Sequence, residues 1–370
     1  MWPGKFALLS LLLCNLSAER SDEKEESPIW RYSSEEASYQ KGIHLFPKGL
    51  CIQGPLGVFT GGEAQFFPVE RGRGPVPSYL QLWNGVTWSY EEKGERRELL
   101  CDQIRIDLKE SFAQLLSDAP EQSVQLTWWH SERANDCSPL LQIRARQMEI
   151  EGRKKREKRE CFPILQNVKA EQMVTANYKE KMIIYADRLS LFHHEEREVS
   201  DQLIFSALLP KHLCHFIDHE KKIEITSQSC TASLLKQETF YQGESDLSLK
   251  SEKGTYYKLT KVFFEGDVHV LAWGVANENT SPPLRMVCAD QAIFSLIEES
   301  LLLKAREGHQ VTYLDEQKQC LVRAQRVDLY REKERAEERI RPQGEISVSF
   351  DPEEIEAFVS LQKEYNRSDV

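Results

Sequence analysis

Histidine and cysteine side chains gather in one short stretch of the chain and are its first candidates for chemistry. Five of the nine histidines lie between residues 193 and 219. The spacing His212-x-Cys214-His215-x-x-x-His219 brings together the side-chain types that bind zinc. A structural zinc site needs a second group at standard spacing, and the sequence contains none. We interpret the stretch as an ordinary surface connection and expect neither a metal nor another cofactor.

Carboxylates are the second candidates, because paired carboxylates perform acid–base chemistry. Asp102, Asp187 and Asp290 recur at equivalent places in similar segments, as the residues of a structural repeat do. A catalytic pair instead needs two different environments that separate the two pKa values. The sequence also lacks the GxSxG, HExxH, phosphate-loop and EF-hand motifs. We therefore expect no enzyme activity.

The cysteines allow two interpretations. Beyond Cys14 the chain has eight, and an even number in an exported protein permits four disulfides, whose pairing the spacing leaves open. Cys101, Cys288 and Cys320 lie inside apolar runs, where free buried thiols also occur. No CxxC spacing is present, which argues against zinc ribbons and redox motifs.

A repeated strand must position these side chains. Five segments start from the polar anchors Asp102, Arg146, Asp187, Asp290 and Gln325, and each carries apolar residues two and four places further on. This is the period of a half-buried strand. The anchors are spaced by 44 (146 − 102), 41 (187 − 146) and 35 (325 − 290) residues, and the remaining gap has room for two copies, with 223–234 a plausible one. Such a period indicates a unit that buries its apolar face by stacking on its neighbours.

Glycines mark the approach to several copies, as in Asn84-Gly85-Val86, Glu265-Gly266-Asp267-Val268 and Gln343-Gly344. Glycine at the start of a strand suits a tight turn or a close approach of two backbones. The glycine is absent before the second and third copies, those anchored on Arg146 and Asp187.

Three segments carry a resemblance to a known family: FEGDVHV (264–270), VCADQAIF (287–294) and MIIYADRLSLF (182–192). They resemble the periplasmic OstA/LptA repeat of bacterial lipopolysaccharide transport, and also its relatives LptC and the periplasmic N-terminal domain of LptD. The resemblance is clearest over residues 262–350, fair over 80–192 and poor over 193–260. The chain departs from the pattern where Arg146 and Gln325 replace the aspartate.

The resemblance implies an all-β fold of repeated antiparallel strands that form an elongated, open, V-shaped β-jellyroll with a short C-terminal helix. It implies a lipid-bridging protein that shields the acyl chains of lipopolysaccharide or lipooligosaccharide in an apolar groove during transport to the outer membrane. The implied partners are that lipid, inner- and outer-membrane transport components and further copies of the chain, end to end. The residues expected to line the groove are Ile104, Ile106, Met148, Ile150, Leu189, Leu191, Phe294, Val327, Leu329, Ile346 and Val348.

Composition and order along the chain give the domain organisation. Residues 1–18 predict a secretory signal peptide, with an uncleaved anchor as the alternative, so export is expected. The resemblance implies that the destination is the periplasm of a Gram-negative-type bacterium. A disordered acidic lead (19–43), a first β-repeat region (44–192), a His-rich insertion or connection (193–222), a second β-repeat region (223–350) and a C-terminal helix and tail (351–370) follow. The net charge of −11 argues against nucleic acid as a partner.

Three local patterns give further predictions. Asp201–Leu209 predicts a short helix capped by Ser200. Residues 289–306 fit a helix by propensity, but their register predicts two strands joined by a turn around 298–300. Asp351-Pro352 begins a helix after the last repeat strand, Glu345–Phe350, and its apolar side chains are expected to cover the open end of the repeat.

Three functions remain open at this point. The first is lipid bridging, as the resemblance implies. The second is a non-enzymatic structural or interaction protein of the cell envelope whose apolar strand faces pack fully against each other. The third is a secreted hydrolase. An apolar groove shaped for lipid would separate the first from the second, and convergent polar groups with shifted pKa values would favour the third.

Overall fold

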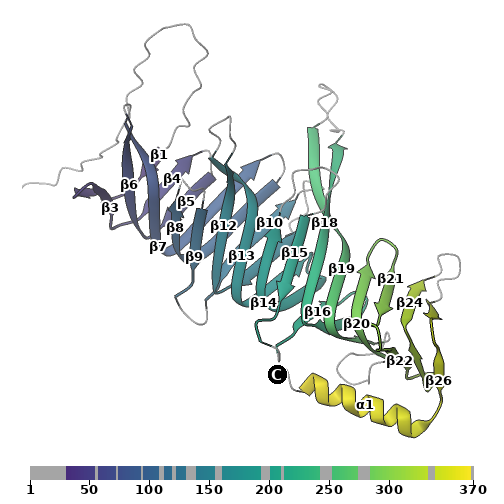
Figure 1. Cartoon of the computed structure of the whole chain (residues 1–370). Helices are drawn as coiled ribbons and strands as arrows, with labels where there is room; N and C mark the ends of the chain where they lie inside the picture. The colour runs from purple at the N-terminus through teal and green to yellow at the C-terminus, as the bar shows by residue number, and fades with distance from the viewer. Residues whose placement is uncertain are drawn as a thin grey trace, which may run out of the picture. The chain divides into compact units, whose positions relative to one another are not determined.

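The computed structural model describes residues 31–54, 57–71, 74–92, 95–107, 112–118, 122–130, 139–154, 161–192, 201–209, 212–241, 252–273, 284–331 and 338–367 (Figure 1). Within these residues the chain forms 26 strands and one helix, so the predicted all-β class with a C-terminal helix is confirmed. The predicted signal peptide lies outside the described residues. No helix among the described residues is both long enough and apolar enough to cross a membrane.

The strands follow one another through the whole described chain. They are β1 (Arg31–Ser33), β2 (Ser38–Gln40), β3 (Ile43–Phe46), β4 (Leu50–Gly54), β5 (Gly57–Gly61), β6 (Glu63–Arg71), β7 (Gly74–Glu92), β8 (Glu95–Asp107), β9 (Phe112–Leu116), β10 (Val124–His130), β11 (Leu141–Ala145), β12 (Gln147–Lys154), β13 (Cys161–Tyr178), β14 (Met182–Phe192), β15 (Asp201–Ser206), β16 (Cys214–Asp218), β17 (Ile223–Ser227), β18 (Ser229–Tyr241), β19 (Glu252–Ala272), β20 (Arg285–Ser295), β21 (Ser300–Lys304), β22 (Val311–Asp315), β23 (Cys320–Ala324), β24 (Arg326–Arg331), β25 (Glu338–Gln343) and β26 (Ser347–Ser349).

The chain divides into two compact units. Unit 1 comprises the described parts of Met1–Glu91, Arg97–Val124 and Glu149–Leu165. In unit 1 the long strand β7 pairs through its first half with β6 and through its second half with β5, and both pairings are antiparallel. Unit 2 comprises the described parts of Glu92–Arg96, Gln125–Met148 and Gln166–Val370.

Unit 2 repeats this division of long strands several times. The first half of β14 pairs with β16 and its second half with β15, whereas β19 pairs first with β18 and then with β17. Following the pairings gives two layers. Layer A runs through the first half of β14, β16, β17, the second half of β19, the first half of β20, β22, β23 and β26. Layer B runs through the second half of β14, β15, β18, the first half of β19, the second half of β20, β21, β24 and β25.

The polar anchors of the repeat lie where the chain passes from one layer to the other. Asp187 and Asp290 stand between the two halves of β14 and β20, and Gln325 stands between β23 and β24. Gln228 occupies the same place between β17 and β18, so the diverged copy at 223–234 is confirmed. We call these positions corners. The strand register predicted around these anchors is therefore the register of the fold.

Strands that pass a corner without such an anchor bend through residues in the left-handed backbone region. In β19 these are Gly266 (φ 79°) and Asp267 (φ 45°), at an interruption of the pairing with β20. In β13 the same place is taken by Gln172 (φ 65°) and Met173 (φ 53°). The segment before Asp187 therefore makes the corner although it has no glycine.

The described part of residues 31–43 and the His-rich connection contain more strand than the sequence predicts. β1, β2 and the first residue of β3 lie within the predicted disordered lead. The helix predicted at Asp201–Leu209 is wrong, because residues 201–206 form β15 and pair with β14 and β18. With β16, this strand continues the repeat through the stretch predicted to be an insertion or connection. The two strands predicted within 289–306 are confirmed as the second half of β20 and β21.

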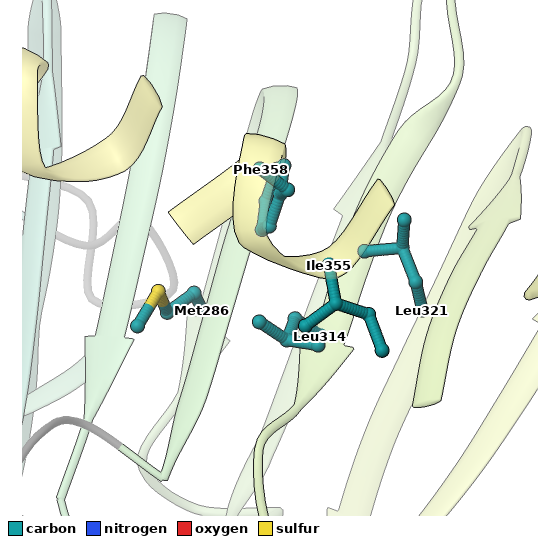
Figure 2. Packing of buried hydrophobic residues seen from close by; sticks show 5 residues of the cluster. All are labelled: Met286, Leu314, Leu321, Ile355 and Phe358. Atoms are coloured by element: carbon teal, nitrogen blue, oxygen red, sulfur yellow. The ribbon is translucent and has the colours of Figure 1, made fainter. Parts of the chain in front are cut away.

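The C-terminal helix α1 (Pro352–Arg367) begins as predicted, since Asp351 Oδ1 accepts a hydrogen bond of 3.0 Å from the backbone N–H of Glu353. Its position differs from the prediction. Ile355 and Phe358 pack against side chains of β20, β22 and β23 (Figure 2). Those side chains are Met286, Leu314 and Leu321, which the strand register places opposite one another.

This packing decides which surface α1 covers. In layer A, Met286 and Leu314 alternate with Val287 and Tyr313, which belong to the other face of the same strands. The helix therefore covers one face of layer A, and the prediction that it covers the open end of the repeat is wrong. The apolar side of α1 is the predicted one, and the surface that receives it is the face of layer A that carries Met286, Leu314 and Leu321.

Candidate functional site

The faces of layers A and B that are turned toward each other are apolar and buried. In layer A the register links Ile184, Phe216, Ile225, Val270, Val287 and Tyr313, all of them buried. In layer B the register links Leu191, Leu203, Ala232, Val262, Phe294, Leu301, Leu329 and Ile340 across eight strands. We call these the inward rows, and the space between them the interior of unit 2.

The structure brings together the predicted groove residues that belong to layer B. Leu189 and Val327 lie on a second inward row, next to the row of Leu191, Phe294 and Leu329. Four of the five are no more than 3% exposed, and Leu329 is half-buried. Arg188, Ser190 and Arg326, which alternate with these five on the same strands, are exposed or half-buried. Met148, also in unit 2, is fully buried, as are Ile104, Ile106 and Ile150 in unit 1.

Two predicted groove residues differ from the others. Val348 on β26 pairs with Val322 and so ends the inward row of layer A, yet it is 51% exposed. Ile346, two residues earlier, is 48% exposed. The inward row of layer A therefore reaches solvent at its last strand.

Aromatic side chains connect the two layers inside unit 2. The ring of Phe216 on layer A lies 5.4 Å from Phe264 and 6.0 Å from Phe294 on layer B, measured between centroids, in edge-to-face geometry. All three rings are buried. Edge-to-face pairs at these distances are favourable beyond their buried area. The three rings therefore occupy the interior at this level.

Two polar contacts join the layers on the side away from the corners, which we call the turn side. The backbone N–H of Leu259 on β19 donates a hydrogen bond of 3.1 Å to the hydroxyl of Tyr178 on β13. The ammonium of Lys221, in the β16–β17 turn, lies 4.8 Å from the ring centroid of Phe294. Both contacts link a residue near layer A to a strand of layer B.

The corner aspartates hold the backbone and do not form a catalytic pair. Asp187 Oδ2 accepts hydrogen bonds from the backbone N–H of Leu208 (2.8 Å) and from His212 Nδ1 (2.9 Å). Asp290 repeats this arrangement with the backbone N–H of Arg306 and with His309. Burial raises the pKa of Asp290, but the Arg306 and His309 hydrogen bonds outweigh it and leave the pKa below its ordinary value.

The zinc-like spacing at 212–219 does not converge in space. His212 bonds to Asp187, the Cys214 thiol is buried, and His215 lies 3.4 Å from Glu224 Oε2. Adjacent residues of a strand point to opposite faces, which separates Cys214 from His215. No group of three or more metal-binding side chains occurs in the described part of the chain.

One cluster of reactive side chains was not apparent from the sequence. His269 and Cys288 are cross-strand partners on β19 and β20, with Nδ1 and Sγ 3.4 Å apart. Gln362 of α1 completes the cluster: its Oε1 lies 3.0 Å from His269 Nδ1, and its amide donates to Cys288 Sγ. Only the pairing of β19 with β20, which brings residues 19 positions apart together, could have revealed it.

The cluster does not support nucleophilic catalysis. Burial raises the pKa of the Cys288 thiol to about 11, so the thiol stays protonated near neutral pH. Nucleophilic attack requires the thiolate, so a protonated Cys288 is a poor nucleophile. The hydrogen bonds of Gln362 to His269 and Cys288 instead help to hold α1 on the sheet. Cys51, Cys101, Cys214, Cys230, Cys288 and Cys320 are all free thiols.

No family model matches the chain, and a search of curated proteins finds no match. The fold and interior therefore define the class as a repetitive antiparallel β protein whose layers enclose apolar rows in unit 2.

Proposed function

We propose that the protein carries the acyl chains of an amphiphilic lipid between its layers and so bridges two membranes, without enzymatic activity. The observation that supports this proposal most is the inward row of layer B. It passes through eight hydrogen-bonded strands without a charged side chain, from Leu191 to Ile340. Such a row presents the same apolar surface to a chain at every step along the repeat.

The energetics favour such a carrier. Each methylene group removed from water contributes about 0.8 kcal/mol, so a fatty acyl chain of ordinary length needs shielding worth on the order of 10 kcal/mol. An apolar lining supplies this without fixing the chain at one place. The exposure of Val348 and Ile346 at the last strand fits a row that continues onto a partner or a second copy.

The resemblance to the OstA/LptA repeat suggests the lipid and the compartment. Under this proposal the cargo is lipopolysaccharide or lipooligosaccharide, and the partners are inner- and outer-membrane transport components. The mature chain would begin near Glu19 and work in the periplasm.

Photo-crosslinking tests the proposal. A photoreactive amino acid is placed at an inward position, Leu189, Phe294 or Val327, or at an outward position, Arg188, Ser190 or Arg326, of the full chain. The photoreactive residues at the inward positions should crosslink to lipopolysaccharide, and those at the outward positions should not. Circular dichroism should confirm that each variant is folded. Equal labelling of both sets would refute the proposal.

A second function is favoured by the aromatic contacts in the interior. Phe216 touches Phe264 and Phe294, as a permanently packed core would require. The protein would then be a structural or interaction protein of the cell envelope. Folded variants that label at neither set of positions would support this alternative.

A further inference from the structure

The β16–β17 turn holds a buried carboxyl with one unused oxygen. Asp218 is fully buried, and its Oδ1 accepts hydrogen bonds from the backbone N–H groups of Glu220 (3.0 Å) and Lys221 (2.9 Å). Its Oδ2 has no hydrogen-bond partner among the described residues. Asp218 lies two residues after Phe216 on β16, so its side chain is on the inward face.

The same turn places a cation against the apolar interior. Lys221 is half-buried, and its ammonium lies 4.8 Å from the centroid of the Phe294 ring, which is 3% exposed. The lysine alkyl chain thus follows apolar surface while the charge stays at the boundary. An ammonium over a ring is held by a weaker attraction than an ammonium beside an anionic oxygen.

The β22–β23 turn provides an internal comparison. It has the same spacing, an aspartate followed by a lysine three positions later, and Asp315 Oδ1 also accepts a hydrogen bond from the lysine N–H. There, however, the ammonium of Lys318 pairs with Asp315 Oδ2 at 3.4 Å. Lys221 instead reaches across to layer B, which leaves Oδ2 of Asp218 without a hydrogen-bond partner among the described residues.

We infer that Lys221 and Asp218 form a binding site for the anionic headgroup of the amphiphile whose chains enter the interior on the turn side. The inference rests on the proposed function. A phosphate oxygen would replace the Phe294 ring as the partner of the Lys221 ammonium. Asp218 Oδ2 would donate a hydrogen bond to a second oxygen of the same group.

The surroundings of Asp218 shift its carboxyl toward the protonated form. Burial raises the pKa of this carboxyl, and the hydrogen bond from Lys221 N–H and the lysine charge oppose the rise without cancelling it. A second anion at the site would raise the pKa further, because like charges disfavour ionisation. Binding of the headgroup therefore favours the protonated carboxyl that donates to it.

Binding of two soluble lipids with identical chains tests the inference. Dioctanoyl phosphatidate carries a phosphate, and dioctanoylglycerol carries none. The full chain should bind the phosphatidate about tenfold more tightly than the neutral lipid, as one charge-assisted contact would provide. Lys221→Met should remove this preference while keeping affinity for the neutral lipid, and the control Lys318→Met, in the equivalent turn, should keep the preference.

The outcomes separate the two proposals. If the wild-type chain binds both lipids equally, or if Lys221→Met keeps the preference, the headgroup site is refuted while lipid binding stands. If Lys318→Met abolishes the preference as completely as Lys221→Met does, the effect is one of net charge and the site is again refuted. If neither lipid binds, the proposed function fails and the headgroup site with it.

Discussion

Replacing Met173 by glycine should stabilise unit 2, although it deletes an apolar side chain. Met173 and Gln172 occupy the left-handed region at the β13 corner, with φ of 53° and 65°. A non-glycine residue in this region costs roughly 1–2 kcal/mol. The Met173 side chain is 70% exposed, so its removal sacrifices little packing.

The expected magnitude is the difference between two opposing effects. Glycine relieves the left-handed strain of roughly 1–2 kcal/mol. It also loses more backbone freedom on folding, which costs roughly 0.5–1 kcal/mol. The midpoints of the two ranges give a net stabilisation of about 0.75 kcal/mol. A matched control is Ser190→Gly, at a half-buried position of the neighbouring strand β14, where the same mutant residue should destabilise by up to ~1 kcal/mol.

Hydrogen exchange is the suitable assay, since the chain has two units and a single unfolding midpoint would not assign the change to one of them. Exchange of the β13 and β14 amides should slow several-fold in Met173→Gly and accelerate in Ser190→Gly. A Met173→Gly variant that exchanges as fast as the control variant would refute the corner argument. Gly266→Ala should give the opposite sign, because a Cβ at φ 79° would also meet the Gln228 side chain.

Two further predictions concern the corner carboxylate of β20 and the C-terminal helix. The folded-state pKa of Asp290 is lowered, so the stability that its carboxylate contributes is present above its ordinary pKa of about 4 and is lost as the pH falls through the folded-state pKa. Asp290→Asn should therefore cost about 1 kcal/mol of stability at pH 7. The difference between the urea midpoints at pH 7 and pH 3 should be smaller in this variant than in the wild-type chain. Truncation after Phe350 should expose the apolar surface that Ile355 and Phe358 cover, and each of these buried side chains contributes about 1.5–3 kcal/mol of stability. The truncated chain should bind more of a hydrophobic dye than the intact chain, and its mass from light scattering should rise with concentration. Equal dye binding and equal mass for the two chains would show that α1 does not protect this surface.

The strand register could be predicted from the sequence because it depends on local alternation. The anchors at Asp187, Asp290 and Gln325 each start a run whose apolar residues fall on one face, and a shift by one residue would expose that face. The structure uses the same positions as corners, and at Asp187 and Asp290 the carboxylate accepts a hydrogen bond from a backbone N–H further along the chain. The polar residue that marks the start of each alternating run is therefore also the residue that stands at the corner.

Strand β15 could not be predicted in the same way. Leu203, Ile204 and Phe205 are all apolar, so no alternation marks this strand, and a short helix fits the run equally well. Pairing with β14 and β18 decides the matter, and those contacts are not local. The corner at Gln172–Met173 could not be predicted either, because no glycine marks it in the sequence. The surrounding strands impose the left-handed backbone on these two residues.

The surface that α1 covers could have been predicted from a second pattern in the sequence, which is adjacent apolar residues within a strand. Met286-Val287, Tyr313-Leu314 and Leu321-Val322 are pairs of adjacent apolar residues within strands. Adjacent residues of a strand point to opposite faces, so such pairs indicate a strand covered on both sides. One member of each pair lies on the inward side, and the other lies under or beside α1.

Because the two faces of these strands have different neighbours, the proposed lipid binding and the role of α1 can be tested independently. Lys221, Phe294 and the inward rows act on one face of the strands, whereas Ile355 and Phe358 cover the other. Loss of α1 should therefore increase association without changing which positions crosslink to lipid. Loss of the Lys221 charge should change the preference among lipids without changing association. A truncated chain that no longer labels at Leu189 would mean that the two faces are coupled through the strands, and layer A would then transmit the state of its outer surface to the interior.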